Sequence, residues 1–294
     1  MSSPTTALIT PSYSRDLERC RRTVESVNRF VDPSIRHYLL IDRRDLPLFR
    51  PLEGSRTVVV TAEDLLPRWL FRVPRARKWW MSLKTKPVRS WIVQQIMKLA
   101  VADHIDADTY CFVDSDVAFI RPLDEQRLHN ERRQTRLFRT PGHADLPTHR
   151  RWHRTAAKLL GLPPTDYFGA DYIGNLITWR RDRLLGLHRH IEQTTGRHWA
   201  KAVASQIHLS EYILYGVYVE HVLGLDTSDH DASDRDLCLC SWHFPMESPE
   251  GRQEFLDALS PGHVSVLVQS NLGLDDTQTD ELVREVADRA ARAA

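Results

Sequence analysis

The stretch that decides the fold is Tyr110-Cys-Phe-Val-Asp-Ser-Asp116. Four apolar residues followed by two carboxylates are typical of a short interior strand that ends at the edge of a sheet. The carboxyl ends of the strands are where α/β proteins bind their ligands. We therefore predict that Asp114, Ser115 and Asp116 lie in a binding site.

The segments on either side of this strand predict an α/β fold with a mostly parallel central sheet flanked by helices. Short apolar runs alternate with segments of helical periodicity, and that alternation favours parallel strands joined by helices. We expect strands at 7–10, 38–42, 57–61, 172–179, 237–244 and 263–269, and helices at 15–30, 87–105, 182–195 and 200–218. The segments 66–87, 124–164 and 226–236 are expected to be irregular, with short helices in the second.

One domain accounts for residues 1–274, because the sequence contains no internal repeat and no low-complexity linker. Residues 275–294 are expected to form an amphipathic helix or a tail. That helix is also a candidate contact for pairing two copies as a homodimer.

Composition excludes several classes of protein. Forty basic residues against thirty-nine acidic ones do not indicate a nucleic-acid partner, so an anionic ligand needs a local site. No stretch is apolar for long enough to span a membrane, and the polar start does not resemble a secretory signal. Four scattered cysteines fit a reducing compartment. We therefore expect a cytoplasmic protein.

The acidic pair is meaningful only because of its context, since Asp-x-Asp occurs four times in the chain. Asp114 and Asp116 alone follow directly on an apolar strand. Two carboxylates suit Mg²⁺ or Mn²⁺, which keeps several waters and takes further oxygens from substrate phosphates. A bound dication would stabilise the charge that develops on a leaving diphosphate. The alternative is an acidic turn that only ends a strand.

Several further motifs accompany the acidic pair. Together they resemble a bacterial family of GT-A-fold glycosyltransferases, over most of residues 7–273. The motifs are Thr10-Pro-Ser-Tyr13, Trp91-Ile-Val-Gln-Gln-Ile-Met-Lys98, Phe112-Val-Asp-Ser-Asp-Val117 with Arg121-Pro122, Leu176-Ile-Thr-Trp179, Ser210-Glu-Tyr-Ile-Leu-Tyr-Gly216 and Gln269-Ser-Asn271.

The resemblance implies a nucleotide-sugar donor, with uridine diphosphate as the preferred carrier. Thr10, Pro11 and Tyr13 resemble the loop that holds the nucleotide base, on which Tyr13 would stack. Gln95 and Lys98 share one helix face and would reach the donor's sugar or phosphate. The alternative is that both reach solvent or a backbone carbonyl.

Three residues near the expected fourth strand are also candidates. Gly174 and Asn175 would let the sugar lie against the backbone, and Asp171 would contact its hydroxyl groups. Tight turns with a capping aspartate explain the same residues equally well.

Glu211 and His243 complete the set of candidates that the resemblance implies. Glu211 would deprotonate the acceptor in an inverting enzyme or support the oxocarbenium-like centre in a retaining one. A glutamate next to the capping Ser210 is also ordinary. His243 resembles a late histidine that completes the metal site, although imidazole is also common as a core group.

The sequence thus predicts a metal-dependent glycosyltransferase that acts on an acceptor of unknown identity. Two alternatives remain open. One is a phosphatase of the haloacid dehalogenase type, which also uses Asp-x-Asp after an apolar strand. The other is a non-catalytic protein that binds nucleotide sugars.

Overall fold

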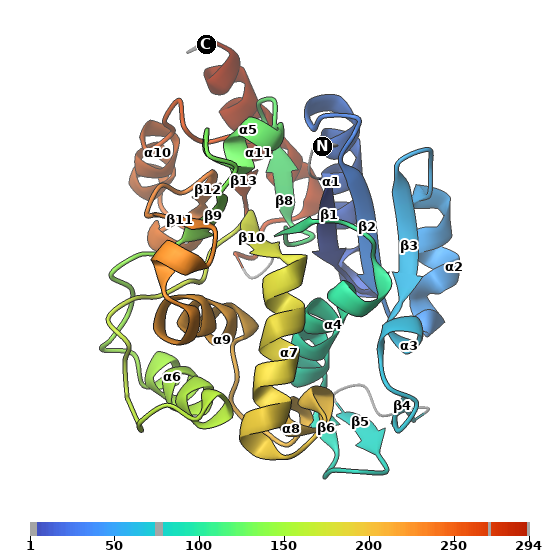
Figure 1. Ribbon diagram of the computed structural model, residues 1–294. Helices are drawn as coiled ribbons and strands as arrows, with labels where there is room; N and C mark the ends of the chain where they lie inside the picture. Colours follow the sequence, from blue (N-terminus) through green and yellow to red (C-terminus); the bar gives the residue numbers. More distant parts are fainter. Residues whose placement is uncertain (1–4, 74–78, 270–271, 293–294) are drawn as a thin grey trace.

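The computed structural model describes residues 5–73, 79–269 and 272–292 (Figure 1). A five-stranded sheet lies at its centre. The strand order is β10 (Ile177–Arg180), β7 (Thr109–Phe112), β1 (Thr6–Pro11), β2 (Arg36–Ile41) and β3 (Thr57–Thr61). Four of these strands are parallel and β10 is antiparallel to β7. The predicted α/β fold with a mostly parallel central sheet is confirmed.

The strand order reverses at β1. From β1 the chain continues to β2 and β3 on one side, whereas β7 adds to the other side of β1 with Ile9 opposite Phe112. Ligands of open α/β sheets bind at such a switch point, beyond the carboxyl ends of the strands. The loop after β1 and the acidic loop after β7 therefore emerge side by side.

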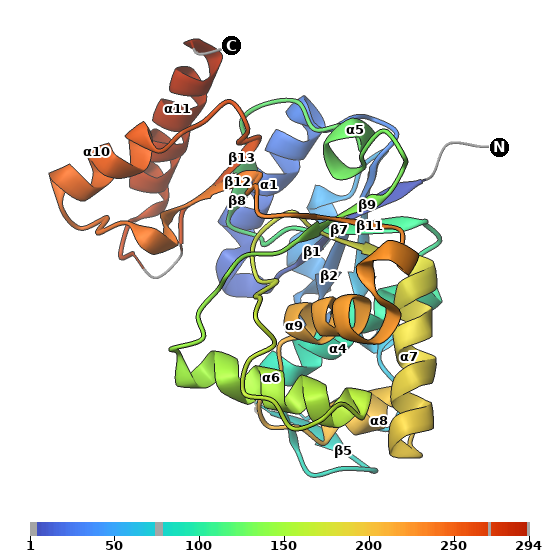
Figure 2. The ribbon, with the colours of Figure 1, turned by 60° about the vertical axis from the view of Figure 1, so that its left-hand side comes forward.

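Alternate residues of the sheet face different helices. Leu8 and Cys111 belong to the core cluster that includes α1 (Leu17–Phe30), while Ile9 and Phe112 pack towards α4 (Ser90–His104). Figure 2 shows α1 on one side of the sheet and α4 with α7 (Arg181–Thr195) on the other. Every strand that borders the switch point is thus buried on both faces.

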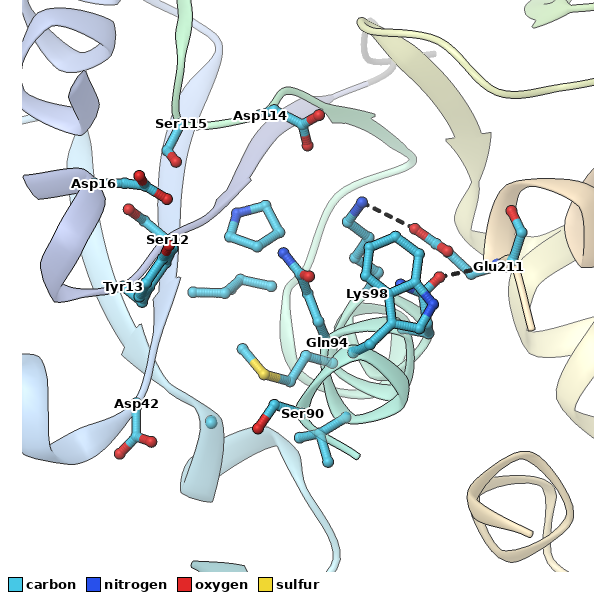
Figure 3. A pocket seen from close by; sticks show the side chains of 18 of the residues that line it. Ser12, Tyr13, Asp16, Asp42, Ser90, Gln94, Lys98, Asp114, Ser115 and Glu211 are labelled. Atoms are coloured by element: carbon cyan, nitrogen blue, oxygen red, sulfur yellow. Dashed lines mark hydrogen bonds and ion pairs between the residues drawn. The ribbon is translucent and has the colours of Figure 1, made fainter. Parts of the chain in front are cut away.

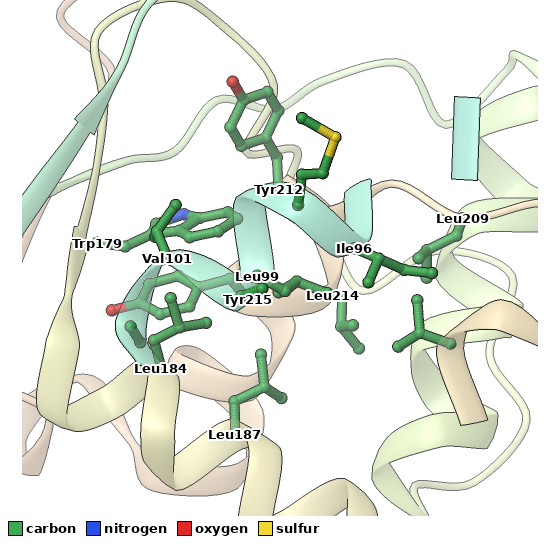
Figure 4. Close-up of a cluster of buried hydrophobic side chains, with 14 of the residues drawn as sticks. Ile96, Leu99, Val101, Trp179, Leu184, Leu187, Leu209, Tyr212, Leu214 and Tyr215 are labelled. Atoms are coloured by element: carbon green, nitrogen blue, oxygen red, sulfur yellow. The ribbon is translucent and has the colours of Figure 1, made fainter. Parts of the chain in front are cut away.

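The largest core cluster holds α4 against α7, α8 (Trp199–Ala204) and α9 (Glu211–Val217) (Figure 4). Trp179 of β10 stacks on Tyr215 of α9 with ring centroids 4.8 Å apart. Leu99 of α4 is fully buried in the same cluster. Close packing leaves these helices little freedom to move, so the polar groups of α4 and α9 face each other in a defined geometry.

A second, smaller layer lies on the α1 side. It contains the sheet β12 (Cys238–Cys240), β13 (Ser265–Leu267) and β8 (Val117–Phe119), with α10 (Pro249–Asp257) and α11 (Asp276–Arg292). Leu282, Val286 and Ala290 of α11 are buried in this layer's core. The apolar face of the C-terminal helix is covered by its own chain. The dimer contact expected at this helix stays a prediction.

Four segments differ from the sequence prediction. Residues 66–87 contain β4 (Leu70–Arg72) and β5 (Trp79–Ser82), which form an antiparallel sheet with β6 (Val88–Arg89) at the start of the segment expected to be helix. Residues 124–164 contain α5 (Glu125–Leu128), β9 (Thr135–Phe138) and the long helix α6 (Pro147–Leu160), and β9 pairs with β11 (His230–Ser233) in the expected acidic loop. The helix expected at 200–218 is divided into α8 and α9. These elements depend on tertiary contacts that local periodicity does not report.

Two short helices, α2 (Leu46–Phe49) and α3 (Ala62–Leu65), complete the region around β3. The four cysteines are buried and free. Among the helices in the described ranges, none combines the length and the apolar character that crossing a bilayer requires.

Candidate functional site

A cleft of about 690 Å³ opens at the carboxyl ends of β1, β2 and β7, within the size range of ligand pockets (Figure 3). The loop after β1 forms one wall, α4 contributes the floor, and the start of α9 forms the opposite wall. Nine of the predicted residues line it: Pro11, Tyr13, Gln95, Lys98, Asp114, Ser115, Asp116, Gly174 and Glu211.

The acidic loop is held in place from both sides. The hydroxyl group of Thr23, on α1, lies 3.0 Å from the carbonyl oxygen of Ser115 and 2.7 Å from that of Val117. The backbone N–H of Asp114 donates to Oδ1 of Asn175, at 3.3 Å. The backbone that carries the two carboxylates is therefore anchored to neighbouring elements, which favours a preorganised site.

Three carboxylates crowd this end of the cleft, which we call the acidic end: Asp16, Asp114 and Asp116. Burial, and then the charge of Asp114, raise the pKa of Asp116 to about 7. Burial also raises the pKa of Asp16, where Asp114 adds to the effect and Arg19 opposes it. Within the described residues, Asp114 and Asp116 form no ion pair, whereas Asp16 pairs with Arg19 at 3.2 Å. Strongly perturbed carboxylates in a cleft are typical of functional sites.

The acidic end suits a hard dication that is only partly held by protein. In the part of the chain that the structure describes, no three His, Cys, Asp or Glu side chains converge as a complete metal cage. Mg²⁺ and Mn²⁺ sites at phosphates often use one or two carboxylates, with water and phosphate oxygens as the remaining ligands. The surplus negative charge at Asp114 and Asp116 fits that arrangement. The side chain of His243 lies outside the described residues, so its predicted ligand role is not placed.

The opposite wall contains a buried ion pair, which we call the paired end: Lys98, Glu211 and Tyr212. Nζ of Lys98 lies 2.9 Å from Oε1 of Glu211 and donates to the hydroxyl oxygen of Tyr212, also at 2.9 Å. Burial acts to lower the pKa of Lys98, but the charge of Glu211 and the nearby Tyr212 outweigh it and raise the pKa. Lys98 is therefore a permanent cation that holds Glu211.

Gln95 anchors the start of α9. Its Oε1 accepts a hydrogen bond from the backbone N–H of Glu211, at 3.1 Å, and the hydroxyl of Ser210 caps the helix at Ile213. The prediction placed Gln95 and Lys98 on a donor's sugar or phosphate, with solvent or a backbone carbonyl as the alternative. Both residues border the cleft, but their polar groups are engaged with α9, because its buried first turn needs partners.

Two predicted donor contacts lie behind the cleft wall. The Thr10 side chain is fully buried and its hydroxyl is 2.9 Å from Nε2 of His37. Asn175 is buried and supports Asp114. We therefore correct the assignment of Thr10 and Asn175, because both shape the binding loops from beneath and neither borders the cleft.

Asp171, predicted to contact the sugar, also lies outside the lining. Its Oδ1 accepts from the backbone N–H groups of Tyr172 and Ile173, and its Oδ2 lies 2.5 Å from Nδ1 of His149. This is the capping turn that the alternative explanation describes. The turn leads to Gly174, where an added Cβ would lie 2.8 Å from the ring of Phe138. Close packing on Phe138 requires glycine there.

Sequence reasoning missed Asp16 and Asp42. Asp16 follows β1, and Asp42 follows β2 and forms an ion pair with Arg72 at 2.7 Å. The signal was available, because polar residues that follow neighbouring parallel strands meet at one edge of the sheet. In the sequence prediction Asp42 is the last residue of the strand at 38–42, and Asp16 belongs to the helix at 15–30.

Comparison of the sequence with models of known protein families identifies the family of this chain. A model described as a family of unknown function (DUF6492) matches residues 5–285. The chain belongs to this family. The match in this DUF6492 protein includes both ends of the cleft and the first part of α11. A search of curated proteins found no match.

Proposed function

We propose that this DUF6492 protein is a metal-dependent glycosyltransferase of the GT-A type that transfers a sugar from a nucleotide-diphosphate donor. One observation carries the proposal: an acidic end, where Asp114 and Asp116 form no ion pair within the described residues, shares a single cleft with the buried Lys98–Glu211 pair, at the switch point of the sheet. Catalytic constellations of α/β proteins are built at this position.

The acidic end would bind the diphosphate part of the donor through Mn²⁺ or Mg²⁺. Asp114 and Asp116 supply carboxylate oxygens, and the bound cation would act as a Lewis acid towards the leaving diphosphate. Tyr13 lines the cleft next to them with 47% of its surface exposed, so its ring is available to stack on the base. The resemblance noted above favours uridine diphosphate.

The paired end would serve the sugar acceptor. Lys98 orients Glu211 on the wall opposite the loop after β1 (Figure 3). A carboxylate placed there removes a proton from the acceptor hydroxyl in an inverting reaction or stabilises positive charge at the sugar in a retaining one. The role of Lys98 is to position Glu211.

The two alternatives predict different products. A phosphatase of the haloacid dehalogenase type would release phosphate from a phosphomonoester, and a binding protein would release nothing.

The decisive experiment combines a binding assay with a turnover assay. Nucleotide sugars are screened by thermal shift with and without Mn²⁺, because a ligand that binds only the native state raises its stability. The best donor is then tested for Mn²⁺-dependent release of the nucleoside diphosphate. Asp114→Ala and Asp116→Ala should each abolish both signals.

Asp234→Ala is the matched control, since Asp234 belongs to another Asp-x-Asp pair and is exposed. It should behave like the wild type. Undiminished turnover in Asp114→Ala or Asp116→Ala removes the metal-site assignment, and phosphate release from a phosphomonoester favours the phosphatase.

A further inference from the structure

The small antiparallel sheet of β4, β5 and β6 has two unlike faces. Leu70, Trp80 and Val88 are buried in the main core. Because successive side chains of a strand alternate between faces, the intervening residues point the other way. Phe71 pairs directly with Met81, and Trp79 pairs with Arg89, on this outer face.

The outer face is exposed and apolar. Phe71, Trp79, Met81 and Leu83 expose 39%, 46%, 39% and 78% of their surfaces. Of the ten large hydrophobic residues that are exposed in the described part of the chain, six lie between Phe71 and Trp91. Single exposed hydrophobic residues are ordinary, but a cluster of this kind marks an interaction surface.

Exposed basic residues outnumber acidic ones around this face, where Glu63 and Asp64 lie at the edge next to Phe71 and Arg68. Between Asp64 and Asp103 the sequence has nine lysines and arginines and no aspartate or glutamate, in a chain whose net charge is only +1. Arg68, Lys84, Lys86 and Arg89 are exposed, and no acidic side chain of the described residues pairs with them. These four exposed cations favour an anionic partner.

We infer that the outer face of the β4–β5–β6 sheet docks on an anionic lipid bilayer. Tryptophan rings lie at the level of the lipid headgroups, Met and Leu reach the acyl region, and lysines pair with anionic lipids. A second copy of the chain fits poorly, because face-to-face pairing would bring the same positive charges together. Nucleic acid fits less well: Phe71 and Trp79 offer rings for stacking on bases, but Met81 and Leu83 on the same face would gain no apolar cover from it.

This sheet forms the end of the molecule away from the C-terminus in both views (Figures 1 and 2). Its inner face contributes Arg72 and Trp80 to the cleft lining. Docking would therefore place the cleft close to the membrane surface. The inference does not depend on glycosyl transfer, since it rests on residues outside the cleft.

The test is co-sedimentation of the full chain with vesicles of phosphatidylcholine alone or mixed with phosphatidylglycerol. We expect binding only to the mixed vesicles, weakened by salt because surface charges are screened. The variant Trp79→Ser with Leu83→Ser should lose binding, and Lys84→Gln with Lys86→Gln should weaken it by on the order of tenfold or more. All four side chains are exposed, so the thermal midpoints should stay close to that of the wild type.

Two control variants make the result specific. Leu48→Ser removes a hydrophobic side chain with 46% exposure on α2, and Arg132→Gln with Arg284→Gln removes two exposed charges elsewhere. Both should bind like the wild type. Absence of vesicle binding, equal binding by all variants, or a Trp79-dependent dimer or nucleic-acid complex in sedimentation would overturn the inference.

Discussion

The acidic end and the paired end of the cleft use the same kind of side chain in opposite ways. Glu211 is neutralised from within, by a buried lysine at 2.9 Å. Asp114 and Asp116 have no such partner in the described residues, and their mutual repulsion adds to burial in raising the pKa of Asp116 to about 7. The carboxylate of the paired end has its counter-charge within the protein, whereas the carboxylates of the acidic end would gain one from a bound cation. The contrast is the reason for proposing a metal at the acidic end and a positioned carboxylate at the paired end.

The largest expected effect is on turnover. If Glu211 faces the acceptor, Glu211→Gln should slow sugar transfer by roughly 10²–10⁴-fold while the donor's dissociation constant changes little. Steady-state and binding measurements on one preparation test this. Glu250→Gln, at an exposed glutamate of α10, is the control. Loss of donor binding with unchanged turnover would show that Glu211 binds the donor and does not act on the acceptor.

The paired end can be broken by removing its cation. Lys98→Met leaves the buried Glu211 without a counter-charge, and we expect about 3–5 kcal/mol less free energy of unfolding. Urea unfolding measures it, and Lys98→Met combined with Glu211→Gln should recover part of the loss. Arg289→Met, at an exposed pair with Asp257, should cost far less. Equal costs at both sites would contradict a buried, coupled pair.

Removing a charge at the acidic end should raise the free energy of unfolding, whereas removing the cation of the paired end lowers it. An acid with a higher pKa in the folded state holds its proton more tightly there, so its contribution to stability is greatest below about pH 4 and is lost as the pH rises through about 7. At about pH 8 the folded protein carries an ionised, poorly solvated Asp116. Asp116→Asn should then raise the free energy of unfolding by about 2–4 kcal/mol, and by little at about pH 4. Asp234→Asn should change neither value.

The smallest effect concerns the support of the acidic loop. Thr23→Val keeps the side-chain shape but leaves the carbonyl groups of Ser115 and Val117 without this hydroxyl. We expect a loss of about 1–2 kcal/mol in unfolding free energy. A larger fractional loss of Mn²⁺-induced stabilisation than of global stability would show that α1 preorganises the loop. Ser34→Ala, at an exposed turn, is the comparison.

How far the sequence predicted the site follows from these residues. The strand before Asp114 was recognisable because its apolar residues are consecutive, and the loop after β1 because a strand precedes it. Asp16 and Asp42 follow β1 and β2 in the same way, so the same rule applied to all three strands would have identified them. The partners of Lys98 and Asp171 could not be predicted, because they depend on the packing of α4 on α9 and of α6 on the loop before Gly174.

Local patterns of the sequence by themselves determined the parallel core of the fold and the position of the acidic pair. Hydrophobic period and strand ends are properties of a few consecutive residues, and for that reason they can be read without a structure. Only the tertiary structure decided that Thr10 and Asn175 lie beneath the cleft, that α11 covers its own core, and that β4, β5 and β6 form a sheet with an exposed apolar face. Each of these outcomes depends on which surfaces the remaining chain buries, and burial is a property of the whole molecule.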